Sequence, residues 1–255
     1  MGGFANYPSL EDRTVFITGG ASGIGKSLVE AFVRQKSRVA FIDLDFDASQ
    51  ALQKRFEDEG LQKPWFKPCD VRDIASLEKC LRNAALDLGP VSVLVNNAGN
   101  DERHKADEIS VEYWDDRIAV NLRHQFFAAR EVARDMKENG GGSIINFGSV
   151  QAYLSSPGMS GYAVSKYGVR GVTRTIAREF GKNNIRVNTV VPGWVMTKRQ
   201  KELWVDEAAE KMIDEVQCLP GRLQPSDVAR LVLFLASDDS AMCTAQDFIV
   251  DAGWV

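Results

Sequence analysis

Short runs of apolar, β-branched residues alternate along this chain with longer amphipathic stretches. Runs such as Thr14–Thr18 and Val91–Asn96 are almost continuously apolar, which is typical of strands covered on both faces of a sheet. The segments predicted to be strands are residues 14–18, 38–43, 64–69, 91–96, 143–147, 185–191 and 248–250.

The amphipathic stretches place apolar residues at the spacing of one helix face. The predicted helices cover residues 25–35, 48–59, 74–88, two long helices near 111–139 with an interruption, and residues 163–182, 206–217 and 225–236. Regular alternation of strand and helix predicts parallel strands joined by crossover helices. We therefore expect one doubly wound α/β domain over residues 1–255, with a parallel sheet flanked by helices.

Composition and charge narrow the classes of function. The 255 residues are 44% hydrophobic and 26% charged, with a formal net charge of −4, which is ordinary for a globular protein. No Lys and Arg cluster indicates a nucleic-acid surface, and no apolar stretch reaches the roughly 18 residues of a membrane span. The first residues show no secretory signal. We expect a cytoplasmic protein without nucleic-acid or membrane partners.

A glycine-rich turn, Thr18-Gly-Gly-Ala-Ser-Gly-Ile-Gly25, lies between the first predicted strand and the first predicted helix. Gly19, Gly23 and Gly25 let the backbone turn sharply and approach a pyrophosphate, which the N–H groups of the helix N-terminus can bind. Read alone, such a turn also fits an ordinary loop. Its position between a strand and a helix favours a dinucleotide site.

Asp43 ends the second predicted strand, 18 residues after Gly25. An acid at this position accepts hydrogen bonds from ribose hydroxyls and repels the 2′-phosphate of NADP. Ser22, rather than a cation, precedes Gly23, and further acids follow Asp43. The pattern favours NAD, and the alternative is that Asp43 is a solvated acid at a strand end.

Three motifs together resemble the signature set of the short-chain dehydrogenase/reductase family. They are the turn Thr18–Gly25, the run Asn96-Asn-Ala-Gly99, and Tyr162-x-x-x-Lys166, and the resemblance extends from about residue 10 to the C-terminus. It implies a Rossmann-type fold. The residues that it implies in cofactor binding are Gly19, Ser22, Gly23, Ile24, Gly25, Asp43, Asp70, Val71, Asn97, Ala98, Gly99, Tyr162, Lys166, Pro192, Gly193, Val195 and Thr197.

Tyr162 and Lys166 are the candidate catalytic pair. Residues four apart project from one face of a helix, and this spacing alone also fits a surface pair. Free tyrosine has a pKa of about 10, and a neighbouring ammonium favours the phenolate. We therefore expect Lys166 to lower the pKa of Tyr162, so that Tyr162 exchanges a proton with the substrate near neutral pH.

The resemblance implies two further catalytic residues. Ser149 stands where the family has the serine that hydrogen-bonds the reacting oxygen, although the family often has two serines there and this chain has Gly148-Ser149. Asn121 matches the asparagine that holds a water relay to the lysine, whereas without the family it is only a polar residue in a helix.

Several segments, among them NNAGNDERHK, VVPGWVMTKRQ and the terminal DAGWV, resemble bacterial aldose 1-dehydrogenases. This resemblance implies oxidation of an aldose sugar such as xylose or arabinose at C1 to the lactone, without a metal. The polar loop 100–105 suits a polyhydroxylated substrate and equally fits a solvated loop. A substrate lid is expected at about residues 194–222, with a plain surface helix as the alternative. The candidate substrate residues are Asn100, His104, Ser149, Gln151, Tyr162, Trp194 and Arg199.

Some of these residues have two interpretations. Trp194 either stacks on a sugar face or packs within the lid, and His104 either contacts the substrate or holds the loop. His104 and His124 are the only histidines and lack an identified acid partner, so no metal site is predicted. The cysteines show no C-x-x-C pair and are expected to be reduced, buried thiols.

Two other functions remain open. One is an NAD(P)-dependent reductase of another ketone or alcohol, which would favour NADP and an apolar pocket; the acidic end of the second strand argues against it. The other is a nucleotide-sensing protein without turnover, against which the intact Asn, Ser, Tyr and Lys set argues. The family resemblance further implies a homotetramer.

Overall fold

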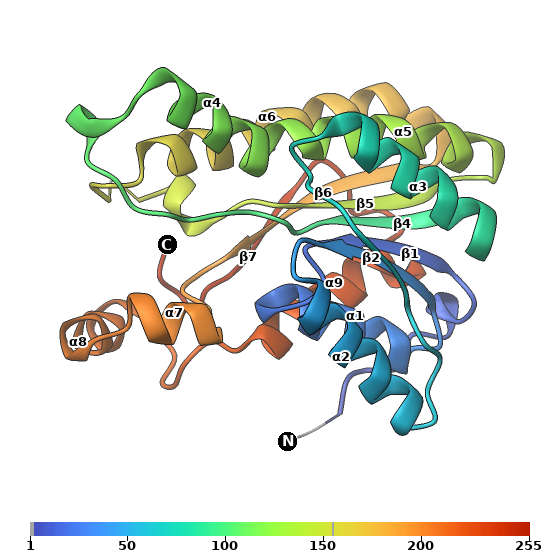
Figure 1. The fold of residues 1–255 in the computed structure, drawn as a ribbon, viewed down its shortest axis with the longest axis horizontal. Coiled ribbons are helices and arrows are strands. Elements are labelled where there is room, and N and C mark those ends of the chain that lie inside the picture. The colour runs from blue at the N-terminus through green and yellow to red at the C-terminus, as the bar shows by residue number, and fades with distance from the viewer. Residues whose placement is uncertain (1–2, 155) are drawn as a thin grey trace.

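The computed structural model describes residues 3–154 and 156–255, and at its centre lies a seven-stranded parallel sheet (Figure 1). The strand order is β3-β2-β1-β4-β5-β6-β7, and each neighbouring pair is parallel. The strands are β1 (Thr14–Thr18), β2 (Arg38–Asp43), β3 (Trp65–Pro68), β4 (Val91–Asn96), β5 (Gly142–Phe147), β6 (Ile185–Pro192) and β7 (Asp247–Val250).

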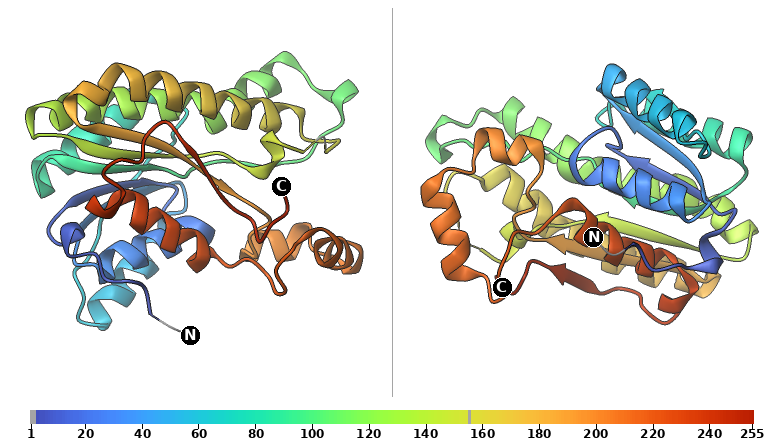
Figure 2. Two further views of the ribbon diagram at one scale, coloured as in Figure 1. Left: turned by 180° about the vertical axis from the view of Figure 1, so that it is seen from behind. Right: turned by 90° about the horizontal axis from the view of Figure 1, so that it is seen from below.

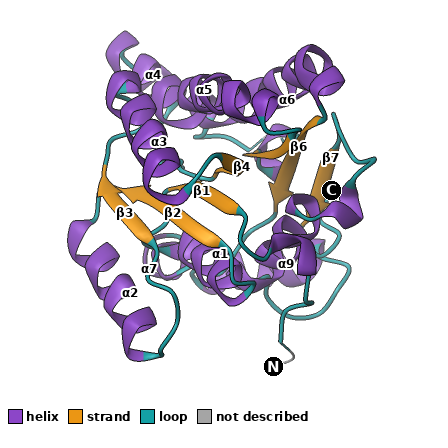
Figure 3. Ribbon diagram, turned by 90° about the vertical axis from the view of Figure 1, so that its right-hand side faces the viewer, coloured by secondary structure: helices purple, strands orange, loops and turns teal. Residues whose placement is uncertain are grey.

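Helices cover both faces of this sheet. Those on one face are α1 (Gly23–Arg34), α2 (Phe46–Asp58) and α9 (Pro225–Ala236); those on the other are α3 (Ile74–Leu88), α4 (Val111–Ile118), α5 (His124–Glu138) and α6 (Ser160–Phe180) (Figure 3). Two further helices, α7 (Lys198–Leu203) and α8 (Glu207–Val216), project beyond the sheet after β6 (Figure 2). The predicted doubly wound, Rossmann-type α/β fold is confirmed.

The two layers of helices create two hydrophobic cores. In β1, Val15 and Ile17 face the core formed with α1 and α9, whereas Phe16 faces the core formed with α3, α5 and α6. All three side chains are fully buried. Because successive strand residues point to opposite faces, a strand covered on both sides must be apolar throughout.

Several boundaries differ from the sequence-based prediction. Helix α1 begins at Gly23, inside the glycine-rich turn, and α6 begins at Ser160, which places Tyr162 in its first turn. The interruption expected near residues 111–139 is a π-helical segment, Ala119–Arg123, that joins α4 to α5 without a loop. Helix α7 was not predicted, because six residues are too few for a periodic apolar pattern.

Two findings concern the membrane and the cysteines. In the described part of the chain, no helix combines the length and apolarity needed to cross a bilayer. The four cysteines, all described, form no disulfide. Cys69 and Cys80 are buried, Cys243 is partly buried and Cys218 is exposed, so a packing role fits the first two thiols better than Cys218.

The core makes a direct prediction for Phe32, a fully buried residue of α1. Phe32→Ala should lower the free energy of unfolding by about 3–5 kcal/mol, because it removes buried apolar surface and leaves a cavity. Urea denaturation measures this loss. Leu86→Ala is the control, since Leu86 is 83% exposed and should change stability little. Equal effects of the two substitutions would contradict the assignment of the core.

Candidate active site

A cleft of about 1310 Å³ opens where the strands of the sheet end. Strand order reverses between β1 and β4, so the chain leaves these neighbouring strands toward opposite faces and a crevice remains between the two loops. The glycine-rich turn, the loops that follow β2, β4, β5 and β6, and the segment around α7 all contribute to the lining. The predicted lid segment, residues 194–222, thus borders the same cavity as the predicted cofactor residues.

The glycine-rich turn forms a cradle with little room for side chains. Gly19 has a φ of +70°, and a Cβ on Gly25 would lie 1.7 Å from the carbonyl oxygen of Gly19. Ser22, just before α1, makes no capping hydrogen bond through its own side chain in the described structure. The first N–H groups of α1 therefore face the cleft, and backbone is exposed where a pyrophosphate would fit.

Asn97 fastens this cradle to the end of β4. Its Nδ2 atom donates to the carbonyl oxygens of Thr18 at 3.0 Å and Gly19 at 2.9 Å. The Ala98 N–H in turn donates to Oγ1 of Thr18 at 3.0 Å. Asn97 and Ala98 therefore set the shape of the turn as well as lining the cleft.

Asp43 is more than a solvated acid at the end of β2. Its Oδ2 atom accepts a hydrogen bond from the Ala21 N–H at 2.8 Å, and its Oδ1 atom accepts one from the Asp45 N–H at 3.0 Å. It also lines the cleft. These bonds hold a carboxylate beside the cradle, where the ribose of a bound dinucleotide would lie.

Asp70 and Val71 line the same end of the cleft. The Asp70 carboxylate lies 2.6 Å from Nη2 of Arg72, and the hydrogen bonds from Arg72 lower the pKa of Asp70. Val71 is buried and offers an apolar surface. Asp70 and Val71 thus place a carboxylate beside an apolar surface. This combination suits the adenine contact that is expected for these residues.

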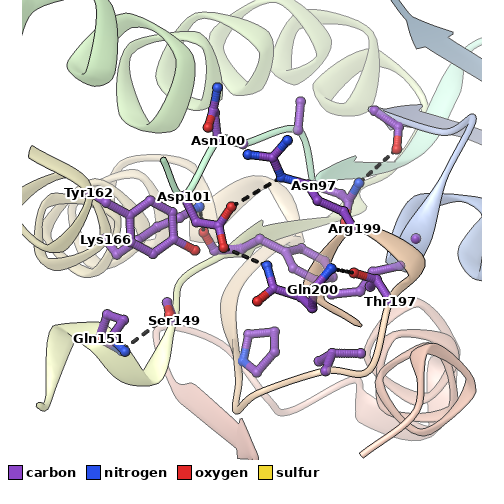
Figure 4. Close-up of a pocket in the computed structure, with 18 of the residues that line it drawn as sticks. Asn97, Asn100, Asp101, Ser149, Gln151, Tyr162, Lys166, Thr197, Arg199 and Gln200 are labelled. Carbon is purple, nitrogen blue, oxygen red and sulfur yellow. Dashed lines mark hydrogen bonds and ion pairs between the residues drawn. The ribbon is translucent and has the colours of Figure 1, made fainter. Parts of the chain in front are cut away.

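The predicted catalytic residues Tyr162, Lys166 and Ser149 come together in the cleft (Figure 4). The Lys166 ammonium lies 5.4 Å from the centre of the Tyr162 ring and donates to the Phe147 carbonyl at 2.8 Å. Ser149 follows β5, and its Oγ accepts a hydrogen bond from the Gln151 N–H at 3.2 Å. The end of β5 and the first two turns of α6 therefore bring the three groups together.

Burial dominates the electrostatics of this pair. It raises the pKa of Tyr162, the charge of Asp101 raises it further, and a hydrogen bond with Ser149 lowers it. Burial lowers the pKa of Lys166 to about 8, against an opposing effect of Asp101. In this arrangement the pKa of Tyr162 is raised rather than lowered, because burial of the phenolate outweighs the hydrogen bond with Ser149.

Asn121 lies behind this group, in the π-helical segment, and is not among the described residues that line the cleft. Its Oδ1 atom accepts from the Asn100 N–H at 2.8 Å, and its Nδ2 atom donates to the Asn100 carbonyl at 3.0 Å. A Cβ on Gly99 would lie 3.0 Å from Oδ1 of Asn121 and 3.5 Å from Nζ of Lys166. Asn121 thus braces the start of the loop after β4, close to Lys166.

The neighbours of Asn121 were not predicted as site residues. Gln125 Nε2 donates to the Asn121 carbonyl at 3.1 Å and to the Phe147 carbonyl at 3.4 Å, the same oxygen that Lys166 uses. His124 is buried, and burial followed by the charge of Lys166 lowers its pKa to about 3, so it is neutral. Among the described residues, no group of three or more His, Cys, Asp or Glu side chains is placed to hold a metal ion.

The predicted substrate residues are brought together with one exception. Asn100, Gln151, Trp194 and Arg199 line the cleft beside the catalytic group. His104 does not: its Nδ1 atom lies 3.2 Å from the Tyr113 hydroxyl, and its Nε2 atom accepts from the Gly161 N–H at 3.4 Å. The substrate interpretation of His104 is corrected to a role in holding its loop.

Sequence reasoning missed the residues that link the loop after β4 to α7. Asp101 accepts a hydrogen bond from Nε2 of Gln200 at 2.6 Å, and Oε1 of Gln200 accepts one from Nε1 of Trp194 at 2.8 Å. The Trp194 ring also lies 6.2 Å from the Trp254 ring. The polarity of loop 100–105 was the available signal, but sequence does not show which loop side chains point inward.

Comparisons with known proteins agree with this geometry. A family model described as enoyl-(acyl carrier protein) reductase matches residues 19–255. The chain is 46% identical to a D-xylose 1-dehydrogenase of Caulobacter vibrioides, over 98% of both chains. It is 43% identical to a probable galactose dehydrogenase of Rhizobium meliloti, over 98% of this chain and 97% of that protein.

A solved structure is also similar. It is a 7α-hydroxysteroid dehydrogenase in complex with NADH and 7-oxo glycochenodeoxycholic acid, with a TM-score of 0.92 and 28% identity. The match covers 97% of this chain and 96% of the other. The similarity therefore extends through the sheet, the cleft and the segment around α7.

The cradle makes a prediction for Gly25. Gly25→Ala should weaken NADH binding at least about tenfold, because the new methyl group collides with the Gly19 carbonyl and displaces the turn. Titration of NADH fluorescence measures the affinity. Gly171→Ala is the control, since a Cβ there meets nothing within 4 Å. Unchanged NADH affinity in Gly25→Ala would show that the cradle is not the binding site.

Proposed function

Because the chain belongs to the short-chain dehydrogenase/reductase family of oxidoreductases, we propose that it is an NAD-dependent sugar 1-dehydrogenase. The proposed reaction oxidises an aldose, such as the aldopentoses xylose or arabinose, at C1 to the lactone. The observation that carries the proposal is the meeting of Tyr162, Lys166 and Ser149 in a cleft to which the loop after β4 and helix α7 contribute polar side chains. Two relatives that act on sugars support it, one on D-xylose and one, by its name, on galactose.

The polar end of the cleft suits a polyhydroxylated substrate. Asn100, Asp101, Gln151 and Arg199 line it, and Oε1 of Gln151 is a buried oxygen without a hydrogen-bond partner in the described structure. A buried acceptor without a partner costs free energy that a substrate hydroxyl can recover. A steroid or an acyl chain offers few such hydroxyls, so this lining favours a sugar.

The chain's own residues hold the reacting groups and move the proton. In the proposed mechanism, the Tyr162 oxygen takes the proton of the sugar C1 hydroxyl. The Ser149 hydroxyl forms a hydrogen bond with that sugar oxygen. Lys166 binds the nicotinamide ribose and supplies positive charge, and Asn121 positions the backbone behind Lys166. A nicotinamide cofactor held in the cleft would supply the hydride acceptor for C1 and positive charge near Tyr162.

Residues 194–222 form the proposed lid over this substrate. The residues proposed to contact the nicotinamide end are Pro192, Gly193, Val195 and Thr197.

We further propose that the protein acts in the cytoplasm as a homotetramer. Support for assembly comes from apolar side chains on the outer surface of α5 and α6, where Phe126, Val164 and Tyr167 are exposed in the single chain. Burial of such a patch between copies would remove apolar surface from water.

The activity prediction is direct. The purified protein should form NADH, seen as absorbance at about 340 nm (the nicotinamide band), with at least one aldopentose or aldohexose. Tyr162→Phe should lower kcat/KM by at least about a hundredfold, because it removes the proton acceptor. Leu86→Ala, on the exposed surface of α3, serves as the unaffected control.

If no sugar gives NADH although the protein measurably binds NADH, the sugar proposal is rejected. Turnover of ketones with NADPH under those conditions would instead support a reductase. Binding without turnover of any substrate would support a nucleotide sensor.

A separate prediction concerns the choice of cofactor. The wild-type protein should prefer NAD over NADP, because a 2′-phosphate would lie beside the Asp43 carboxylate. Asp43→Asn keeps the side-chain shape and removes the charge, so the ratio of kcat/KM for NAD to that for NADP should fall at least about tenfold. The matched control is Asp47→Asn, which changes an exposed acid in the first turn of α2. An equal fall in both variants would mean that general surface charge, not Asp43, sets the preference.

A further inference from the structure

The loop after β4 contacts α7 and the adjoining Trp204 through three side-chain pairs, which we call the clasp, and Arg103 of this loop also lies 5.7 Å from the centre of the Trp194 ring. Asp101 accepts a hydrogen bond from Gln200 at 2.6 Å and lies 3.5 Å from Nε of Arg199. The Arg103 guanidinium lies 4.2 Å from the centre of the Trp204 ring. Figure 4 shows Asp101 joined by dashed lines to Arg199 and Gln200 and lying beside Tyr162. One carboxylate thus links two distant segments of the chain.

Helix α7 depends on such contacts for its position. None of its residues, all of which the structure describes, is buried. A six-residue helix is also too short to be stable alone. Buried side chains of its own therefore do not hold α7 over the cleft, and the clasp does so together with the hydrogen bond from Trp194 to Gln200.

Asp101 also faces the catalytic pair. Its negative charge raises the pKa of Tyr162 and that of Lys166. The other groups that act on Tyr162 are the Ser149 hydroxyl and the Lys166 ammonium, while His124 beside Lys166 is neutral. The Arg199 guanidinium lies 3.5 Å from the Asp101 carboxylate, so its positive charge partly offsets the Asp101 charge in this arrangement.

We propose that Asp101 is a positioning residue that couples docking of the lid to proton transfer at Tyr162. With α7 docked, Asp101 holds the lid through Gln200 and Arg199, and its charge is partly neutralised. With α7 released, the unpaired carboxylate opposes formation of tyrosinate. Tyr162 therefore accepts the substrate proton most readily when the cleft is closed and water is excluded. The inference rests on the proposed function, since it concerns the base of that reaction.

The coupling predicts pH shifts of opposite sign for two substitutions. Asp101→Asn keeps an acceptor for Gln200 but removes the charge, so the acid limb of the kcat/KM profile should move to lower pH by about 0.5 to 1 unit. Arg199→Gln leaves Asp101 hydrogen-bonded to Gln200 but without a positively charged neighbour, so the limb should move to higher pH. Lys201→Gln removes a charge from an exposed residue of the same helix that is not among the cleft lining, and its profile should stay unchanged.

Hydrogen–deuterium exchange of the backbone at residues 198–204 gives a readout that does not need activity. Asp101→Ala removes both contacts of the carboxylate, so exchange there should be severalfold faster than in the wild type, with a smaller increase in Asp101→Asn and Arg199→Gln. Exchange in β4 and β5 should not change, which separates release of the lid from general unfolding. Lys201→Gln is again the control.

Opposite pH shifts together with local exchange would support the coupling. Shifts in the same direction, no shift, or unchanged exchange in Asp101→Ala would overturn it. If the wild-type protein oxidises no sugar, the proposed function fails, and the exchange result alone then decides whether the clasp holds the lid. The two failures are therefore distinguishable.

Discussion

At the end of the sheet, the chain leaves β1 toward one layer of helices and leaves the neighbouring β4 toward the other, and the crevice between these departures is the cleft. Every part of the site depends on this reversal. It exposes the backbone of the glycine-rich turn and lets Asn97 of one loop hydrogen-bond the other. From the end of β5 the chain continues through Ser149 to the first turn of α6, which carries Tyr162.

Two carboxylates in the cleft have different tasks because they have different partners. Asp43 accepts backbone N–H groups, which keep its charge beside the cofactor cradle. Asp101 accepts side-chain groups from a segment that is held only by surface contacts. A backbone-bound carboxylate is a permanent feature of the site, whereas the charge that Asp101 presents depends on the position of α7. In the proposed function, selection of the cofactor and control of the base are thus separated in space.

Stability is distributed unevenly around the cleft. The floor is formed by strands whose side chains, such as Val15 and Phe16, are fully buried in two cores. The lid has a helix without buried residues, fastened by one carboxylate and one arginine–tryptophan contact. Such a division places the reacting groups on rigid elements and leaves the covering segment among the parts that open most easily.

The sequence by itself determined the strands, most helices and the glycine-rich turn, because burial on two faces and close backbone approach restrict residue type at each position. Asp43 was predicted from its place at a strand end, whereas the catalytic roles of Tyr162, Lys166 and Ser149 came from the resemblance to the short-chain dehydrogenase/reductase family. Only the tertiary structure decided the rest. The removal of His104 from the cleft, the inward position of Asp101 and the raised pKa of Tyr162 depend on which segments meet in space. Loop side chains and desolvation leave no periodic pattern, so those features follow from packing between distant parts of the chain.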